Sequence, residues 1–514
     1  MSGRDRPPLF DLPTPKVARR NFLGGVLSAA AGLSVAGGRS AWAAAGAVLH
    51  AAPPPPRPAL DERDRSVVAD LVAGAGLGGV ATWLVVDAAT GQVLDAGQPA
   101  QPLPPASVAK AITALYAYEG LGPQFRFATQ ILATRPLMAG RLPGDLILVG
   151  DGDPTLDSDH LAALLDAGGL SAGEIGGGFF LYDGALPRIR AIDATQPDHV
   201  AYNPAISGLN LNFNRVCFEW QPNGAGGYQI SLDARAVHNR PVVDVAQMRL
   251  VERSAPLYSY VSEGGRDIWS VAASALGKGG TRWLPVRQPA LYTGQAFQAL
   301  AGARGLALPA PRLLAAMPPE TLLLAQHQSA PLPQMVRAML RHSTNLTAET
   351  LGLKTTLMQG GDGPESLDLQ RSGQRMAQWL QTRHGLQDAR FVDHSGLGED
   401  SAISPAGLVQ VLANPGVAEV LQPLLHEFRL EKKLGKTKVL AKTGTLNFVS
   451  ALAGYLLPDG GRPMIFAIML ADVPRRKALP PEARERPAGG RQWANAARHL
   501  QRQMLARWVM RFSA

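Results

Sequence analysis

The spacing of apolar and polar residues differs from one segment of the chain to the next and predicts a different secondary structure for each. A helical pattern at 67–73 is followed by an apolar run at 81–87 that is typical of a strand, and residues 92–95 return as the second strand of a hairpin. Two prolines then keep the backbone extended up to Ser107, after which apolar residues recur at helical spacing. We therefore expect a hairpin followed by a helix whose first turn carries Ser107.

The texture changes twice further along the chain. Residues 131–320 hold many short apolar runs interrupted by Gly and Pro, which indicates β-rich modules with a few helices, one of them at 158–167. From residue 321 helical spacing dominates and ends in three strands. The expected helices are 332–341, 346–358, 367–382 and 405–412, and the expected strands are 439–445, 451–457 and 464–470. We predict that 59–130 and 321–514 form one domain, into which 131–320 insert as accessory domains, two in number.

The last segment predicts an amphipathic helix at 491–512 with arginines on its polar sides. Its apolar stripe consists of Trp493, Ala497, Leu500, Met504, Trp508 and Phe512. Such a helix can lie on a membrane surface, but it more often covers a neighbouring sheet, which is what we expect here. The Pro- and Arg-rich residues 474–490 before it are interpreted as a solvated connection.

Composition and charge exclude several classes of protein. The 514 residues are 46% hydrophobic and 18% charged, as in ordinary globular domains. The formal net charge of +9 is concentrated at the start, where residues 1–43 carry +4. The remaining mild excess suits an anionic polymer or membrane surface, and no nucleic-acid motif or aromatic-interleaved basic patch is present.

The N-terminus carries the features of an export signal. Arg19-Arg20 precede Phe-Leu, a glycine-diluted apolar run follows, and Ala41-Trp42-Ala43 is a small-x-small cleavage site. The paired arginines resemble a twin-arginine signal, so we expect residues 1–43 to direct the chain to the periplasm. An uncleaved membrane anchor is the alternative, although the run is short. The Pro-rich residues 44–58 are expected to form an extended linker.

Two features outside the main pattern receive structural interpretations. Cys217 is the only cysteine, which excludes an internal disulfide and a cysteine-based metal site, and we interpret it as a small buried hydrophobe. Residues 150–157 have the spaced aspartates of a calcium loop. Leu156 and Ala162 stand where an EF-hand needs Gly and Glu, so we predict a turn. No metal or organic cofactor is implied.

The helix start at Ser107 carries the first candidate chemistry. Lys110 lies one turn after Ser107 on the same helix face, and a hydroxyl at a helix N-terminus is favoured to develop negative charge. A neutral amine there can take the hydroxyl proton, which gives an activated nucleophile. The pattern S-x-x-K alone is weak, because a capping serine followed by a solvated lysine has the same spacing.

Two further motifs strengthen this interpretation. Ser343-Thr344-Asn345 is the only S-x-N in the chain and falls in a predicted break between two helices. Lys442-Thr443-Gly444 is the only K-T-G and lies on a predicted strand. The three motifs S-x-x-K, S-x-N and K-T-G therefore each occur on the element type that their chemistry needs, in this order.

With these motifs the sequence resembles the penicillin-recognising serine peptidases. It is most similar to the class C low-molecular-mass penicillin-binding proteins, the D-alanyl-D-alanine carboxypeptidase/endopeptidase family, whose mark is the long insertion between the first two motifs. Further matching stretches are 150–156, 209–214, 345–349, 393–397 and 442–455, so the resemblance covers nearly all of 60–470. Thr344 and His394 occupy positions that are often Asn or Asp, and Gly, in the family.

The resemblance implies a fold and an activity. The fold would be the α/β (α+β) transpeptidase-like one, an antiparallel sheet flanked by helices, with large β-rich inserted domains. The activity would be that of a periplasmic serine D-alanyl-D-alanine carboxypeptidase or D,D-endopeptidase acting on peptidoglycan peptides, with β-lactams as covalent inhibitors. No nucleic-acid partner and at most peripheral membrane contact are expected.

The resemblance also assigns roles to residues. Ser107 would attack the carbonyl of the penultimate D-Ala, and Lys110 would act as general base, for which its amine must be neutral near pH 7 against a free pKa of about 10.4. Ser343 and Asn345 would relay protons and hold Lys110 and the substrate amide. Lys442, with the hydroxyls of Thr443 and Thr445, would bind the terminal carboxylate.

The strand that carries K-T-G has two more implied roles. The backbone N–H groups of Ser107 and Thr445 would form the oxyanion hole. Gly444 lacks a side chain, so that the substrate can add beside the strand. Burial and a positive Lys442 would both favour the neutral form of Lys110.

Two rival functions remain open. A β-lactamase shares the fold and first motif, but the E-x-x-L-N loop of class A enzymes is absent and the insertion is large. A catalytically idle wall-binding or regulatory homologue is the other alternative, although Ser107, Lys110, Asn345 and Lys442 are all intact.

Overall fold

The computed structural model describes residues 66–513 with the exception of 225, 362 and 431–434. The predicted signal at 1–43 and the linker at 44–58 lie outside the described residues. None of the helices in the described part of the chain combines the length and apolar character that crossing a membrane requires.

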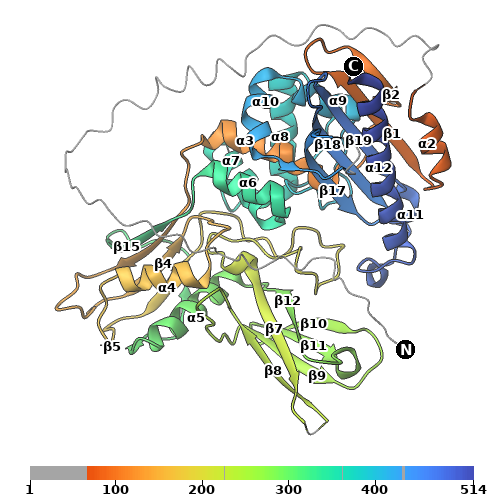
Figure 1. The fold of residues 1–514 in the computed structure, drawn as a ribbon. Helices are drawn as coiled ribbons and strands as arrows, with labels where there is room; N and C mark the ends of the chain where they lie inside the picture. The colour runs from red at the N-terminus through yellow and green to blue at the C-terminus, as the bar shows by residue number, and fades with distance from the viewer. Residues whose placement is uncertain (1–65, 225, 362, 431–434, 514) are drawn as a thin grey trace, which may run out of the picture. The chain divides into compact units, whose positions relative to one another are not determined.

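A six-stranded antiparallel sheet is the framework of the first and last parts of the chain (Figure 1). Its strand order is β16-β17-β18-β19-β1-β2, so the hairpin predicted from residues 81–95 pairs with the last of the three C-terminal strands. The strands are β1 (Val80–Asp87), β2 (Val93–Gly97), β16 (His426–Glu427), β17 (Lys438–Leu446), β18 (Val449–Leu457) and β19 (Met464–Ala471). The predicted meander of three strands is confirmed by the pairing of β17 with β18 and of β18 with β19.

The C-terminal helix α12 (Gly490–Phe512) covers one face of this sheet (Figure 1). The side chains of Trp493, Leu500, Met504 and Trp508 share a core with Val85 and other strand residues on the same face. Because side chains alternate across a strand, the intervening residues Leu84 and Val86 face the opposite side. The stripe on α12 therefore packs against the sheet, as predicted, and its buried apolar face is not available to a membrane.

Helices cover the other side of the sheet and follow the predicted ranges closely. They are α3 (Ala109–Leu121), α6 (Leu332–His342), α7 (Asn345–Gln359), α8 (Leu369–His384), α9 (Pro405–Leu412) and α10 (Pro415–Leu421). The short helix α2 (Ala69–Gly74) before β1 packs instead with α12. α9 contacts β1 and β19, and the 3-10 turn η1 (Ala106–Val108) before α3 contacts β17 and β18. Helix α3 also packs against α6, α7 and α8.

The segment between α3 and α6 builds four further sheets. A five-stranded sheet has the order β14-β6-β4-β3-β15, two three-stranded sheets have the orders β12-β7-β8 and β10-β11-β9, and β13 pairs with β5. β3 (Ala128–Ala133) and β15 (Leu322–Gln328) belong to the five-stranded sheet, so it extends on both sides beyond 131–320. One hydrophobic core runs through these sheets and the helices α4 and α5.

The remaining strands and helices of this segment are short. They are β4 (Leu146–Gly150), α4 (Ser158–Ala167), β5 (Gly173–Glu174), β6 (Phe179–Tyr182), η2 (Asn212–Asn214), β7 (Arg215–Pro222), β8 (Tyr228–Asp233), β9 (Ala246–Val251), β10 (Tyr258–Glu263), β11 (Arg266–Ala272), η3 (Ala273–Ala275), β12 (Gly280–Pro285), α5 (Pro289–Gly302), β13 (Leu306–Ala307) and β14 (Arg312–Leu313). Cys217 is buried in β7, as predicted, and burial raises the pKa of its thiol to about 11.

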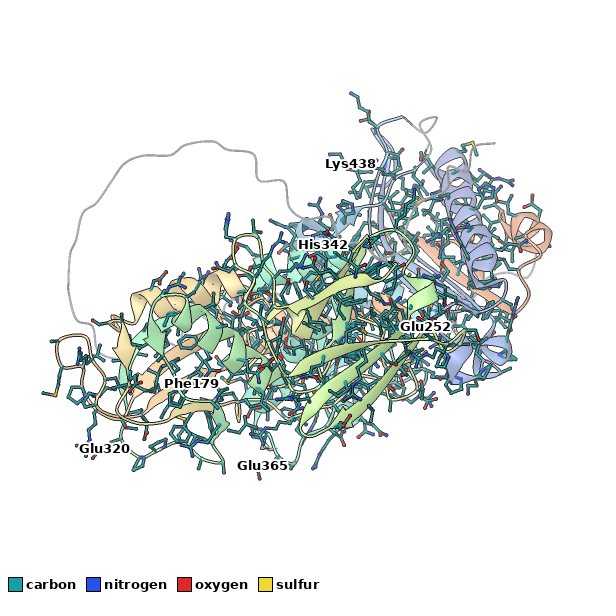
Figure 2. The ribbon with its side chains drawn as sticks, turned by 90° about the horizontal axis from the view of Figure 1, so that it is seen from below. Phe179, Glu252, Glu320, His342, Glu365 and Lys438 are labelled. Carbon is teal, nitrogen blue, oxygen red and sulfur yellow. The ribbon has the colours of Figure 1, made fainter. Side chains whose placement is uncertain are left out.

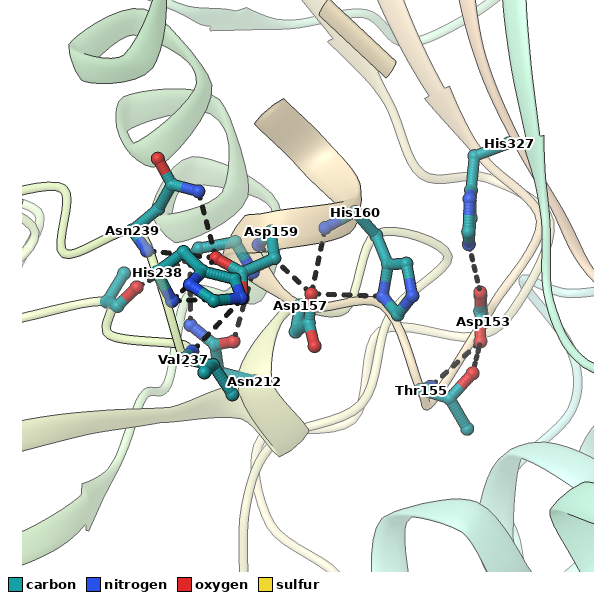
Figure 3. Close-up of polar contacts among 12 residues, drawn as sticks. Asp153, Thr155, Asp157, Asp159, His160, Asn212, Val237, His238, Asn239 and His327 are labelled. Atoms are coloured by element: carbon teal, nitrogen blue, oxygen red, sulfur yellow. Dashed lines mark hydrogen bonds and ion pairs between the residues drawn. The ribbon is translucent and has the colours of Figure 1, made fainter. Parts of the chain in front are cut away.

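The aspartates at 150–157 lie in a turn, as predicted, and Asp153 and Asp157 each accept hydrogen bonds within the protein (Figure 3). Asp153 Oδ1 accepts hydrogen bonds from the backbone N and the hydroxyl of Thr155, and Asp157 caps α4. His160 bonds to Asp157, while Nε2 of His327 lies 3.8 Å from Asp153 Oδ2. Among the described residues no group of three or more His, Cys, Asp or Glu side chains is placed to hold a metal ion.

The interpretation of residues 474–490 as a solvated connection is wrong. The segment begins with α11 (Val473–Lys477) and includes η6 (Pro481–Ala483). The Glu485 carboxylate bonds to His199 at 2.7 Å and to Arg282 at 2.9 Å. Arg484 bonds to Glu399 at 2.8 Å. A Pro- and Arg-rich composition is typical of exposed loops, but here the charges find partners far away in the sequence.

Candidate active site

Ser107 lies in a tight turn that leads directly into a helix. Prolines 104 and 105 precede η1, and α3 begins at Ala109, so Lys110 is one turn beyond the serine. The Lys110 Nζ atom lies 2.9 Å from Ser107 Oγ. Ser107 is half-buried, whereas the side chain of Lys110 has no exposed surface. The hydroxyl thus faces solvent on one side and a desolvated amine on the other.

Lys110 is held by two more oxygen atoms from distant parts of the chain. Its Nζ donates to Asn345 Oδ1 at 2.7 Å and to the backbone carbonyl of Ser395 at 2.8 Å. The S-x-x-K and S-x-N motifs, 235 residues apart at this contact, therefore meet at one nitrogen.

The S-x-N motif occupies the break between α6 and α7, as predicted. Ser343 ends α6 in a left-handed conformation with φ of 56°, and Asn345 is the first residue of α7. The amide nitrogen of Asn345 donates to the backbone carbonyl of Tyr202 at 2.8 Å. Asn345 is therefore oriented from both ends, by Lys110 at its oxygen and by the inserted segment at its nitrogen.

The K-T-G motif lies on β17, beside the turn that carries Ser107. Lys442 Nζ donates to Ser343 Oγ at 3.1 Å and to the carbonyl of Thr443 at 2.7 Å. The side chain of Lys442 is buried, whereas Thr443 and Thr445 are exposed. β16 pairs with β17 only at Leu440 and Ala441, so no strand of the described residues pairs with the same edge beyond them.

Gly444 is required for a reason that the sequence did not predict. A Cβ atom at this position would lie 2.5 Å from the carbonyl oxygen of Pro105 and 3.0 Å from the backbone nitrogen of Ser107. Any side chain would therefore push β17 away from the turn that carries Ser107. The glycine brings the strand close to Ser107, in addition to leaving room beside the strand.

Burial lowers the pKa of both lysines. Desolvation lowers the pKa of Lys110 to about 8, against the opposing charges of Glu349 and Asp393. The pKa of Lys442 falls well below its usual range, first through burial and then through repulsion by Lys110. The expectation that a positive Lys442 keeps Lys110 neutral is therefore wrong for the site without substrate, because burial and the charge of Lys110 both disfavour the ammonium form of Lys442.

Two buried acidic residues, Glu349 and Asp393, lie near Lys110. The sequence reasoning did not assign them a role. Glu349 accepts hydrogen bonds from the backbone N–H groups of His394 and Ser395, and Asp393 accepts from those of Gly396 and Gly398. Burial and the charge of Asp393 raise the pKa of Glu349 to about 8. Both residues lie in stretches that carry the family resemblance, which was the available signal.

The structure thus brings together every residue that the sequence singled out. Lys110 bonds to Ser107 and Asn345, and Lys442 bonds to Ser343, which precedes Asn345 by two residues. Gly444, flanked by Thr443 and Thr445, lies against the turn that carries Ser107. Figure 2 marks His342, the last residue of α6, and Lys438, the first residue of β17, from which the second and third motifs continue. An acyl-transfer site with a serine nucleophile needs this set of groups.

Comparison with known proteins agrees with the geometry. The model of the D-Ala-D-Ala carboxypeptidase 3 (S13) family matches residues 65–493. The chain belongs to this family. Membership in the S13 family confirms the predicted enzyme class, a serine-type D-Ala-D-Ala carboxypeptidase.

Individual relatives of the S13 family are distant in sequence. A D-alanyl-D-alanine carboxypeptidase from Actinomadura sp. (strain R39) is 27% identical over 428 residues, which is 74% of this chain and 76% of the relative. D-alanyl-D-alanine carboxypeptidase DacB from Haemophilus influenzae is 24% identical over 383 residues, 70% of this chain and 79% of the relative. The crystal structure of penicillin binding protein 4 (dacB) from H. influenzae, complexed with a novel β-lactam, matches with a TM-score of 0.66 at 20% identity and covers 85% of this chain and 98% of that one. This likeness confirms the predicted fold class.

Proposed function

We propose that this S13 peptidase cleaves the terminal D-Ala-D-Ala bond, or the equivalent D,D cross-link, of peptidoglycan peptides through an acyl-enzyme on Ser107. The observation that carries the proposal is the 2.9 Å contact between Ser107 Oγ and the fully buried Lys110 Nζ. An amine without solvent, with its pKa lowered to about 8, is available as a base near neutral pH.

The three oxygens around Lys110 give its nitrogen a direction. A neutral amine has two N–H donors and one lone pair. Asn345 Oδ1 and the Ser395 carbonyl can only accept, so they take the two N–H groups. The lone pair is then left for the third neighbour, the Ser107 hydroxyl, which donates its proton. The two acceptors thus orient the base toward the nucleophile.

The reaction follows from these positions. Ser107 Oγ bonds to the carbonyl carbon of the penultimate D-Ala while its proton passes to Lys110. The backbone N–H groups of Ser107 and Thr445 stabilise the oxyanion. Lys110 returns the proton to the leaving amine as the peptide bond breaks, and a water molecule then hydrolyses the ester and frees Ser107.

Lys442 and the exposed hydroxyls of Thr443 and Thr445 bind the terminal carboxylate of the substrate. A carboxylate beside Lys442 supplies the opposite charge that its burial lacks, so substrate binding favours the ammonium form. The unpaired edge of β17 beyond Ala441 accepts the peptide as an additional strand. Ser343, which accepts a hydrogen bond from Lys442, relays protons in the site.

The expected place of action is the periplasm, reached through the twin-arginine-type signal predicted at 1–43. Peptidoglycan peptides are the substrates there, and β-lactams, which carry a strained amide in place of the scissile bond, are the covalent inhibitors. The H. influenzae protein of the same fold, which was solved in complex with a β-lactam, supports this assignment.

Labelling with a fluorescent penicillin tests the proposal. The wild-type protein and Cys217→Ala should both be labelled covalently, because Cys217 is buried in β7, and Ser107→Ala should not. Labelling that persists in Ser107→Ala would show that another residue is the nucleophile. Rapid steady-state hydrolysis of a chromogenic cephalosporin would instead identify a β-lactamase.

Product analysis distinguishes the remaining activities. Digestion of purified muropeptides followed by mass analysis separates loss of D-Ala, which identifies a carboxypeptidase, from cleavage of cross-linked dimers, which identifies an endopeptidase. A labelled protein that cleaves neither substrate would be the idle homologue.

A further inference from the structure

A column of polar side chains is buried beneath the proposed active site and takes no part in the mechanism above. It starts at His394, whose Nε2 lies 2.7 Å from Ser372 Oγ. Ser372 Oγ lies 2.6 Å from Thr356 Oγ1, which lies 3.1 Å from the Tyr116 hydroxyl. Tyr116 then donates to Gln359 Oε1 at 2.9 Å. His394, Ser372 and Tyr116 have no exposed surface, and Gln359 lies at the protein surface.

His394 is the point at which three helices are joined. Its ring reaches Ser372 and Met376 on α8, and it stacks on Tyr116 of α3 with an interplanar angle of 7°. Its backbone nitrogen donates to Glu349 on α7, and its carbonyl accepts from the Thr113 hydroxyl on α3 at 2.6 Å. One residue therefore fixes the 393–395 backbone against α3, α7 and α8.

The contacts of the ring define its tautomer. Nδ1 lies 3.4 Å from Met376 Sδ, and a thioether sulfur can only accept. Nδ1 therefore carries the hydrogen, and Nε2 accepts the hydroxyl hydrogen of Ser372. Burial lowers the pKa of His394 to about 3, so the ring is neutral. It is an uncharged anchor.

The ring of His394 fits in the core because residue 352 is a glycine. A Cβ atom on Gly352 of α7 would lie 2.1 Å from His394 Cγ, so the glycine and the histidine fit as a pair. The family to which the sequence was likened often has glycine at position 394. The ring is therefore an addition to this chain, and its contacts all act on the backbone that ends in Ser395.

The next residue after the anchor contacts the proposed base. The Ser395 carbonyl is one of the two acceptors that orient the Lys110 amine toward Ser107. We propose that His394 is a positioning residue for acylation, which through its bonds to Ser372 and its stacking on Tyr116 fixes the Ser395 carbonyl against Lys110 Nζ. This inference rests on the proposed function, because it assumes that Lys110 is the base.

The pH profile of acylation provides the test. The Ser395 carbonyl favours the ammonium form of Lys110, so weakening this contact lowers the pKa of the amine. The neutral amine is then also less well oriented toward Ser107. The other charged groups that act on Lys110 are Glu349 on α7, Asp393 in the same turn and Lys442 on β17, and all three are retained in the variants. In His394→Gly the plateau rate of penicillin acylation should fall about 10-fold. The acid limb of the profile, which is the rise in rate as Lys110 loses its proton, should move to lower pH by about half to one unit.

Two variants separate positioning from a general loss of packing. His394→Gln can still accept the Ser372 hydrogen and should return the acid limb to its wild-type position. Ser372→Ala keeps the ring of His394 but removes its hydrogen-bond partner, so it should shift the acid limb in the same direction as His394→Gly. If His394→Gly does not fold, Ser372→Ala provides the test. Thr355→Ala is the matched control on α7, because Thr355 is fully buried and its hydroxyl donates, within the described part of the chain, to the carbonyl of Leu351 in its own helix. It should lose thermal stability without moving the limb.

The possible results are distinguishable. An acid limb that stays in place in both His394→Gly and Ser372→Ala, or that moves equally in Thr355→Ala, overturns the role of His394 while penicillin labelling of Ser107 stands. Absence of labelling in the wild-type protein, or labelling of Ser107→Ala, overturns the proposed function itself.

Discussion

The surroundings of Lys110 and Lys442 differ, although both amines are buried in the same site. Three oxygens, one on each of three separate segments, lie within hydrogen-bond distance of Lys110 Nζ, and two buried carboxylates favour its charge. Lys442 donates to two oxygens, and the charge that acts on it is that of Lys110, which is repulsive. One lysine has its counter-charges built in, and the other does not.

The difference indicates how two like residues can take different parts in one reaction. Burial lowers the pKa of Lys110 and the charges of Glu349 and Asp393 oppose that shift, which leaves the pKa at about 8. Under the proposed function, such an amine would both accept and return a proton. The charge that acts on Lys442 is the repulsive one of Lys110, so under the same proposal its own charge would depend on the carboxylate of the substrate. The four predictions below test this contrast, from the largest effect to the smallest.

The largest effect should follow the loss of the base. Lys110→Met gives an unbranched side chain one atom shorter and removes the basic nitrogen, so the rate of acylation by penicillin should fall about 10³-fold. Stopped-flow or gel-based labelling measures this rate. A loss below tenfold would mean that another group accepts the Ser107 proton, and that the contrast assigns the wrong roles.

A smaller and different loss should follow substitution of the second lysine. In Lys442→Met, acylation at low substrate concentration should fall about 10- to 100-fold, because a charge-assisted bond to the carboxylate is removed. The loss should be smaller for a substrate whose terminal carboxylate is replaced by an amide. An equal loss for both substrates would contradict the role of Lys442 in carboxylate binding.

The carboxylates beneath Lys110 should control the pH dependence. In the wild-type protein acylation should rise as the pH passes through about 8, because Lys110 loses its proton there. Glu349 acts to raise the pKa of Lys110, so Glu349→Gln should move this rise to lower pH by about one unit. Asp393→Asn should move it in the same direction by less. A shift to higher pH in either variant would show that these groups do not stabilise the ammonium form.

The smallest effect on acylation should come from substitution of Glu485, which bonds to His199 in the inserted segment. Burial favours the neutral form of Glu485, but the hydrogen bond to His199 and the charge of Arg282 lower its pKa to about 2. The carboxylate therefore stabilises the fold above its unfolded pKa of about 4.3, and this contribution is lost as the pH falls toward about 2. Glu485→Gln should cost about 1–2 kcal/mol at neutral pH in denaturant titrations.

The same variant should leave the acid limb of acylation in place. Glu485 contacts His199 in the segment whose Tyr202 carbonyl orients Asn345, but it does not contact either lysine. A displaced limb in Glu485→Gln would mean that the local surroundings of the two lysines do not account for their difference. The stability loss without a displaced limb would support the comparison.

Much of the fold followed from the sequence because its signals were local. The helices at 158–167 and 405–412 have the predicted bounds, since Asp157 and Ser404 cap them and apolar spacing marks their length. The side chains of the three motifs were also identifiable, because S-x-x-K, S-x-N and K-T-G fix residue types at fixed spacing.

What the sequence did not predict depends on contacts between distant segments. The carbonyls of Ser395 and Tyr202 orient Lys110 and Asn345, and a backbone carbonyl has no signature in a sequence. Residues 474–490 resemble a loop by composition, yet Arg484 and Glu485 bond to residues more than 80 positions away. The charge state of Lys442 depends on burial and on Lys110, which only the folded arrangement reveals.

The pairing of β1 with β19 sets the order in which this enzyme can become competent. Val80 lies opposite Ala471, and Trp493 bonds to the carbonyl of Leu77. During synthesis the first hairpin must wait for a neighbour that is made almost last, and closing so long a loop is slow. A chain shortened before Met464 contains Ser107 and Lys110 but lacks β19, the strand that lies between β18 and β1 in the sheet. The sheet of the enzyme is therefore complete only when nearly the whole polypeptide has been produced.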